Sequence, residues 1–280
     1  MHVAVITRPG SIPGQRNAGW WSYPVPYFTF DHYPTPKGVT LARERFKAYD
    51  LVFWEDGKTL VHWVGVGPPI AYLVGDSTLS DDHYQRRLEM AKQADLILVD
   101  MDRLERFGGL GASVRRFTYC VNDTRFRDYG EGKSVDVAYH MSEDDAHRVI
   151  LANDLEGICR ERGWVMKRGV ILGEEYARSL ARARIVVNIS RNPETRNHRL
   201  FDAMGSGACV LAERPPAIDG EVLVYVEMEG DLREQLAWLL AGEWKTYAER
   251  GLACVRQHHT WAVRAQQLRS ILAEVWPWLA

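Results

Sequence analysis

The feature that most constrains the fold is a recurring alternation of short apolar runs with segments of helical spacing. Each run is bounded by polar or turn-forming residues, which is typical of a strand buried in a parallel sheet. In the first half we expect strands at 3–7, 50–54, 70–74 and 95–99 and a helix at 82–92. Strands that alternate with helices indicate βαβ units. The first half is therefore predicted to be an α/β domain.

The alternation restarts after residues 122–133, a charged and aperiodic segment that we interpret as a linker. Further strands are expected at 135–139, 165–172, 185–189, 208–212 and 222–226, and helices at 146–162, 174–183, 198–204, 231–240 and 247–271. The fold class is thus α/β, with two Rossmann-like domains at 1–130 and 131–258. Residues 259–280 are expected to form a C-terminal helix that can cross back to the first domain.

The composition is that of an ordinary globular protein, with 46% hydrophobic and 26% charged residues and a net charge of −2. This balance gives no general attraction to nucleic acid or to membranes, although recurring arginine clusters leave a local basic patch open. The four cysteines form no CxxC pair, and no apolar run approaches the roughly 20 residues of a membrane span. We expect a soluble, cytoplasmic protein.

The most informative segment is 184–213, which is predicted to form a buried strand, a basic loop, a helix, a glycine turn and a second strand. A helix that begins at the carboxyl edge of a parallel sheet presents free N–H groups and a positive dipole end, which attract phosphate. The basic residues expected around this start are Arg191, Arg196, His198 and Arg199. Asp202 is placed to accept hydrogen bonds from ribose hydroxyls, unless it only forms a solvated ion pair with Arg199.

This segment resembles the C-terminal domain of GT-B glycosyltransferases of the group 1 type, specifically the spore-maturation-protein-like family. Glu194 and Asp202 have the spacing of that family's Glu-x7-Glu pattern, with Asp in the second place. Further similar positions are Ala203, Gly207, the strand through Val210, the preceding helix and strand at 175–188, and the closing 259–264. The resemblance covers 135–272, and the first half by layout only.

The resemblance implies two parallel-sheet domains that face each other across a cleft, and a nucleotide-diphosphate sugar, such as a UDP-sugar, as the donor. Asp202 would bind the ribose, and Glu194 the donor sugar. The diphosphate would be held by the amides around Asn197 and His198, together with Arg196 or Arg199. Ser190 and Arg191 are further candidates for donor binding. Residues between Arg168 and Gly173 would flank the nucleobase. His140 stands where many relatives have glycine, and it either contributes to the phosphate site or is a packed histidine.

Acidic residues follow several first-half strands, at the edge where the acceptor would bind. An inverting transfer needs a base, for which Asp76 is our first candidate, Glu55 the second and His32 the third. In a retaining transfer Asp76 would orient the acceptor, and it could also simply cap a helix. The aromatic pair Trp20 and Trp21 is our candidate acceptor surface, because aromatic faces stack on sugars.

The predicted activity is that of a hexosyl- or pentosyltransferase that needs no cofactor and no metal. Its acceptor would be a hydroxyl of a small molecule, a glycan, a protein or a modified DNA base, and the net charge of −2 weighs against DNA. The alternatives are an epimerase or phosphorylase on the GT-B scaffold, and a non-catalytic nucleotide-binding protein. The sequence does not fix the oligomeric state.

Overall fold

A computed structural model describes residues 1–7, 26–36, 38–55, 61–74, 81–99, 104–143, 145–189, 197–213 and 223–279. The chain divides into two compact units. Unit 1 consists mainly of Met1–Thr118 and Trp261–Ala280, and unit 2 of Tyr119–Pro215 and Asp219–Thr260. The C-terminal segment therefore belongs to the same unit as the N-terminal half of the chain.

Unit 1 contains a parallel sheet, with the strand order β2-β1-β4-β6-β7-β8 in its described residues. Its strands are β1 (His2–Thr7), β2 (Thr29–Pro34), β4 (Leu51–Glu55), β6 (Ile70–Val74), β7 (Leu96–Val99) and β8 (Ser113–Arg116). The apolar runs of β1, β4, β6 and β7 confirm the predicted strands. All five pairings are parallel, so the carboxyl ends of these strands lie at one edge.

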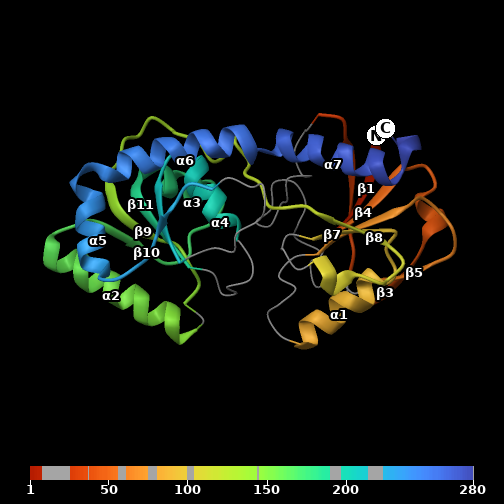
Figure 1. Cartoon of the computed structure of the whole chain (residues 1–280), viewed down its shortest axis with the longest axis horizontal. Helices are drawn as coiled ribbons and strands as arrows, with labels where there is room; N and C mark the ends of the chain where they lie inside the picture. Colours follow the sequence, from red (N-terminus) through yellow and green to blue (C-terminus); the bar gives the residue numbers. More distant parts are fainter. Residues whose placement is uncertain are drawn as a thin grey trace. The chain divides into compact units, whose positions relative to one another are not determined.

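Helices cover this sheet on opposite sides, where Figure 1 shows α1 (Asp81–Ala91) and α7 (Trp261–Val275). On the α1 side, Ile6, Trp54 and Tyr72 form a buried core with Met90. A separate pair of parallel strands, β3 (Val39–Ala42) and β5 (Val61–Val64), was not predicted. Short helical turns at Arg43–Phe46, Leu104–Phe107 and Pro277–Leu279 complete the described elements of unit 1.

Unit 2 has a second parallel sheet, with the described strand order β10-β9-β11-β12-β13. Its strands are β9 (Val135–Tyr139), β10 (Met166–Arg168), β11 (Ala183–Asn188), β12 (Cys209–Ala212) and β13 (Val226–Glu227). Its helices are α2 (Ala146–Arg162), α3 (Gly173–Arg182), α4 (His198–Gly205), α5 (Leu232–Trp238), the π-helical turn Leu239–Glu243 and α6 (Trp244–His258). These elements confirm the predicted α/β organisation of the second half.

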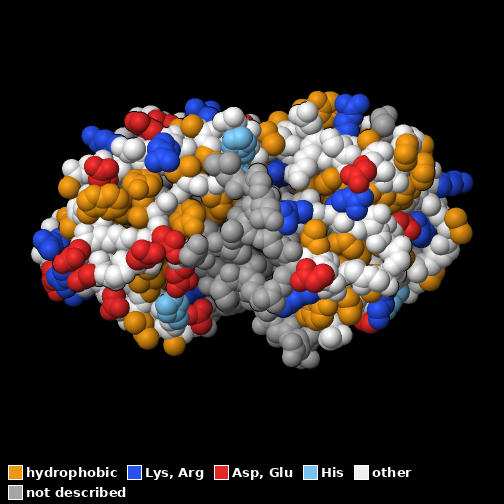
Figure 2. All heavy atoms as spheres, in the orientation of Figure 1, with side chains coloured by type: hydrophobic (Ala, Val, Ile, Leu, Met, Phe, Trp, Pro, Cys, Tyr) orange, Lys and Arg blue, Asp and Glu red, His pale blue; other side chains and the backbone are white. Residues whose placement is uncertain are grey.

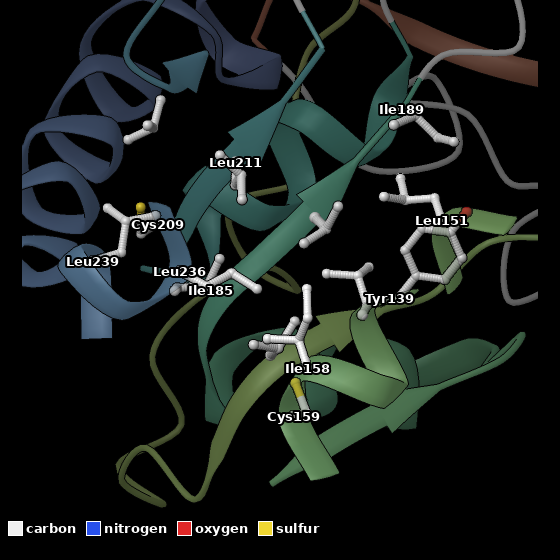
Figure 3. Close-up of a cluster of buried hydrophobic side chains, with 14 of the residues drawn as sticks. Tyr139, Leu151, Ile158, Cys159, Ile185, Ile189, Cys209, Leu211, Leu236 and Leu239 are labelled. Atoms are coloured by element: carbon white, nitrogen blue, oxygen red, sulfur yellow. The ribbon is translucent and has the colours of Figure 1, made fainter. Parts of the chain in front are cut away.

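Alternate residues of the unit 2 strands enter two different cores, because successive strand side chains point to opposite faces. Ile185 and Leu211 pack with α2 and α5 on one face, and Figure 3 shows this cluster. Val186 and Val210 pack with α3, α4 and α6 on the other face. Unit 2 is therefore a helix–sheet–helix sandwich, a layering that Figure 1 also shows.

Three sequence expectations are corrected by the structure. The single helix predicted at 247–271 is wrong, because α6 ends at His258 and α7 begins at Trp261. His259 between them has non-helical backbone angles, and its carbonyl accepts a hydrogen bond from the Val121 amide at 2.8 Å. The segment interpreted as a linker lies in unit 2, where Phe126 packs into the core. The strand predicted at 222–226 is displaced, because β13 covers Val226–Glu227, whereas the strand predicted within 165–172 is present as β10, Met166–Arg168.

Charges of both signs are interspersed on the visible face of each unit in Figure 2, in keeping with the net charge of −2. None of the helices in the described part of the chain is long and apolar enough to cross a membrane.

Candidate functional site

The start of α4 forms the centre of the predicted phosphate site, at the carboxyl edge of the unit 2 sheet. Asn197 caps the helix with extended backbone angles, and its Oδ1 accepts a hydrogen bond from the Leu200 amide at 3.2 Å. Its Nδ2 donates to the Ile189 carbonyl at 3.4 Å, which ties the cap to the end of β11. The chain returns to β12 through Gly207, whose φ of +68° favours glycine. The predicted strand, helix, glycine turn and strand are therefore all present.

Arg199 lies in the first turn of α4, and its Nη1 is buried without a hydrogen-bond partner within the described structure. Its side chain hydrogen-bonds Tyr176 of α3. Burial lowers the pKa of Arg199, and the nearby charge of Arg148 on α2 acts in the same direction. A buried N–H group without an acceptor is costly, and two neighbouring guanidinium groups repel each other. This position is therefore suited to an anionic ligand.

Asp202 lies one turn further along α4 and is only partly exposed. Burial raises its pKa to about 8, against the opposing effect of the charges of Arg125 and Arg199. Arg199 and Asp202 interact electrostatically, but these two described residues form no direct ion pair. The alternative of a simple surface ion pair therefore does not hold. In its ionised form this carboxyl can accept hydrogen bonds from the hydroxyls of a ligand.

Tyr176 joins several elements around this helix start. Its ring contacts that of Phe126 edge-on, with centroids 5.8 Å apart, and that of His140 at 6.1 Å. Burial raises its pKa, so the phenol stays protonated and can donate a hydrogen bond. Arg125 donates from Nη2 to the carbonyl of Gly173, at the start of α3. Sequence reasoning missed Arg125, Arg148 and Tyr176, because each meets the site only through tertiary contacts.

His140 is buried after β9 with both ring nitrogens engaged. Nδ1 lies 3.1 Å from the Gly169 carbonyl, and Nε2 lies 2.7 Å from Ser179 Oγ. Since a carbonyl only accepts, Nδ1 carries the proton, and Nε2 accepts from the hydroxyl. Burial also lowers the pKa of His140, so the ring is neutral. These contacts are those of a packed histidine, the second of the two predicted alternatives.

The segment predicted to flank the nucleobase follows β10. The Arg168 guanidinium forms a fork with Glu143, with N–O distances of 2.7 and 2.6 Å, and holds the pKa of that carboxyl below its usual range. Glu156 and Asn153 also bind Arg168, so its charge is already compensated. The residues beyond it carry exposed apolar side chains, with Val170 54% and Leu172 46% exposed. The segment thus presents apolar rather than charged surface.

The described residues locate only part of the predicted site. Ser190, Arg191, Glu194 and Arg196 of the donor set, and Asp76, Trp20 and Trp21 of the acceptor set, lie outside them. His198 is exposed, with its ring 3.8 Å from that of Tyr119 between centroids. In unit 1, Glu55 ends β4 at the carboxyl edge of the sheet, and His32 pairs with Val5 inside the sheet. The strands that carry them, β4 and β2, both flank β1.

In the part of the chain described here, no group of three or more His, Cys, Asp or Glu side chains is arranged to hold a metal ion.

A family model described as "Glycosyl transferase-like" matches residues 125–270, which include every described residue of the α4 site. No curated protein sequence matches the chain significantly.

Solved structures match over most or nearly all of the chain. A sucrose-phosphate synthase from Thermosynechococcus elongatus is 14% identical with a TM-score of 0.64, and 99% of each chain is covered. HepE from Anabaena, in complex with UDP and glucose, is 12% identical with a TM-score of 0.58, covering 98% of this chain and 100% of that one. A glycosyltransferase from Rickettsia africae is 8% identical with a TM-score of 0.52, covering 82% and 78%. At these identities the similarity concerns the fold.

Proposed function

The chain belongs to the glycosyl transferase-like family and has the GT-B fold, and from this premise we propose that it transfers a sugar from a nucleotide-diphosphate sugar to a hydroxyl acceptor. A UDP-sugar is the donor we propose first, since the structurally similar HepE was solved with UDP and glucose. The donor would bind to unit 2, around the start of α4.

The observation that carries this proposal is the buried Nη1 of Arg199, which lacks a hydrogen-bond partner in the described residues. A diphosphate oxygen would supply the missing acceptor. The backbone N–H groups of the α4 start would add further donors, because the first turn of a helix leaves its amides unpaired. Charge-assisted hydrogen bonds of this kind are roughly twice as strong as neutral ones.

Arg148 would be the second cation that a diphosphate meets. Its side chain is buried at the start of α2, held by Ser142 at 3.2 Å from Nη1 and by Asp145 at 3.3 Å from Nε. Its charge acts on that of Arg199, and an anion bound near both would replace their repulsion by attraction. Arg148 would in this way supply a second positive charge to the diphosphate.

The nucleoside would bind through two further features. Asp202 would hold the ribose hydroxyls, with a side chain one methylene shorter than the glutamate usual in the family. The exposed Val170 and Leu172 would pack against the face of the base, in the segment predicted for it. The sugar would extend toward Glu194, which keeps the family's spacing to Asp202.

The acceptor would be activated by residues of unit 1. Asp76 is the base that we propose first, with Glu55 and His32 as second and third candidates. Glu55 is supported by its place at the carboxyl edge of a parallel sheet, where ligands of such sheets bind. Trp20 and Trp21 would offer stacking surface for a sugar or for a planar base.

Replacement of Arg199 tests the donor site. Arg199→Ala is expected to weaken nucleoside diphosphate binding about 10- to 100-fold and to leave binding of the free nucleoside nearly unchanged, because only the diphosphate uses the guanidinium. Isothermal titration calorimetry measures both affinities. Arg160→Ala is the matched control, since Arg160 is 76% exposed on α2. An equal loss for nucleoside and nucleoside diphosphate would contradict the phosphate role of Arg199.

A further inference from the structure

Arg125 belongs to the segment that precedes β9, and its side chain crosses to the start of α3. Its Nη2 donates a hydrogen bond to the carbonyl of Gly173, the first residue of α3. Gly173 has a φ of +66°, so the chain enters the helix through a conformation that favours glycine. The backbone of Arg125 is itself fixed, because its amide donates to Asn122 and its carbonyl accepts from the Tyr129 hydroxyl at 2.5 Å. The backbone that carries the guanidinium is therefore fixed by two hydrogen bonds.

The same side chain is connected to the α4 site through aromatic contacts. The guanidinium carbon lies 5.3 Å from the centroid of the Phe126 ring, within the range of a cation–π interaction. Phe126 contacts Tyr176 edge-on, and Tyr176 hydrogen-bonds Arg199. Arg125 is partly exposed, and in the described structure its side chain makes no hydrogen bond other than that to Gly173. Its remaining donors are thus available to the site.

The positive charge of Arg125 acts on the carboxyl of Asp202. Three described groups interact electrostatically with this carboxyl. They are Arg199 on the same helix, Tyr176 on α3 and Arg125 in the segment before β9. Of the two arginines, Arg125 has the larger effect in lowering the pKa of Asp202, although it is distant in sequence. The side chain of Arg199 also hydrogen-bonds Tyr176. Arg125 is therefore the main charge that opposes the effect of burial on Asp202.

We propose that Arg125 is a positioning residue of the donor site, which fixes the Gly173 turn and supplies the positive charge that lets Asp202 meet the donor's ribose as a carboxylate. This inference rests on the proposed function, because it takes Asp202 as the ribose ligand. It adds a residue that the strand, loop and helix of 184–213 do not contain. The segment 119–128 would thereby form part of the donor site.

The charge effect is tested in the ligand-free protein, independently of any nucleotide. The titration of the Asp202 carboxyl is followed by carbon-13 NMR, with Asp202→Asn to assign its signal. Arg125→Gln keeps a donor for the Gly173 carbonyl but removes the charge, and it should move the midpoint upward by about one pH unit. Arg125→Lys keeps the charge and should titrate like the wild type. Arg127→Gln, at an exposed arginine over Tyr129, is the matched control.

Nucleoside diphosphate affinity at pH 7 and pH 9 provides the second readout. Arg125→Gln should bind UDP about tenfold more weakly than the wild type at pH 7 and recover most of this loss at pH 9, where Asp202 ionises without help. Arg125→Lys should show a smaller loss at pH 7. A purely structural role would instead give the same loss at both pH values.

Two results would overturn the inference, and a third would overturn the proposed function. An Asp202 midpoint in Arg125→Gln equal to that of the wild type would remove the charge role, as would an equal shift in Arg125→Lys. If the wild type binds no nucleotide at either pH, the donor site itself fails and the positioning role fails with it. The NMR midpoints then still establish whether Arg125 controls the ionisation of Asp202.

Discussion

At the scale of single residues, the proposed donor site combines a largely buried carboxyl with arginines from three different segments. Asp202 has a pKa raised to about 8 by burial, even though Arg125 and Arg199 oppose this effect. Such groups cluster at functional sites, because a binding site must desolvate the side chains that later meet a ligand. In the ligand-free protein, burial therefore makes the Asp202 carboxyl harder to ionise.

The raised pKa of Asp202 predicts that the stability of the protein depends on pH. The folded-state pKa of Asp202 lies above its unfolded value, so the folded state holds a proton that the unfolded state has lost between about pH 4 and pH 8. The wild type should therefore lose stability relative to Asp202→Asn as the pH rises through this window, by up to about 1.4 kcal/mol per pH unit. Urea unfolding of both proteins at several pH values measures the difference, and a constant difference would contradict the raised pKa.

The residues of the site were only partly predictable from the sequence. Asn197, Arg199 and Asp202 could be proposed because a helix start at a sheet edge is a local pattern with a known chemistry. Arg125 and Tyr176 carry no such local signal, since their roles come from contacts with residues far along the chain. His140 could not be assigned from sequence either, because its two hydrogen bonds come from β10–α3 and from α3.

At the scale of elements, α4 is held against the segment that carries Arg125. Gly205 at the end of this helix leaves no room for a side chain, because an added Cβ would lie 2.9 Å from Val121 Cγ2 and 3.4 Å from the Phe126 carbonyl oxygen. The close approach brings the Val121–Phe126 segment, and with it Arg125, alongside the helix that carries Arg199 and Asp202. The glycine thus serves packing rather than the turn.

Gly205→Ala is accordingly expected to destabilise the protein by about 1–3 kcal/mol, the usual cost of overpacking a core. Thermal and urea unfolding measure this change. Gly157→Ala is the control, because Gly157 lies within α2 and an added Cβ there meets nothing within 4 Å. That substitution should raise stability by about 0.5–1 kcal/mol through helix propensity. Equal effects of the two substitutions would show that the contact at Gly205 is unimportant.

Element boundaries were predictable where their signals are local. The predicted helix 146–162 coincides with α2, whose Asp145 cap accepts from the Arg148 amide and whose Gly163 ends it with a φ of +69°. The break between α6 and α7 has no glycine or proline to mark it, and it depends on the tertiary hydrogen bond from Val121 to His259. The strands β3 and β5 escaped prediction because they are short and expose alternate residues.

At the scale of the whole molecule, the same architecture is used twice, since each unit is built on a parallel sheet. The repeated alternation of apolar runs and helices made this fold class predictable, because parallel strands must be buried on both faces. The division after Thr118 was less visible, because residues beyond it look like a linker yet pack into unit 2. The acceptor has no comparable sequence signal.

We propose that this glycosyltransferase takes its sugar from a nucleotide-diphosphate donor. The most direct test is to incubate the protein with a panel of nucleotide-sugars, with and without candidate hydroxyl acceptors, and to measure release of nucleoside diphosphate. We expect release from a UDP-sugar, unchanged by EDTA, with Asp76→Asn binding the donor but releasing almost no nucleotide. If no nucleotide-sugar is turned over and none raises the melting temperature of the wild type, the donor-site account is contradicted.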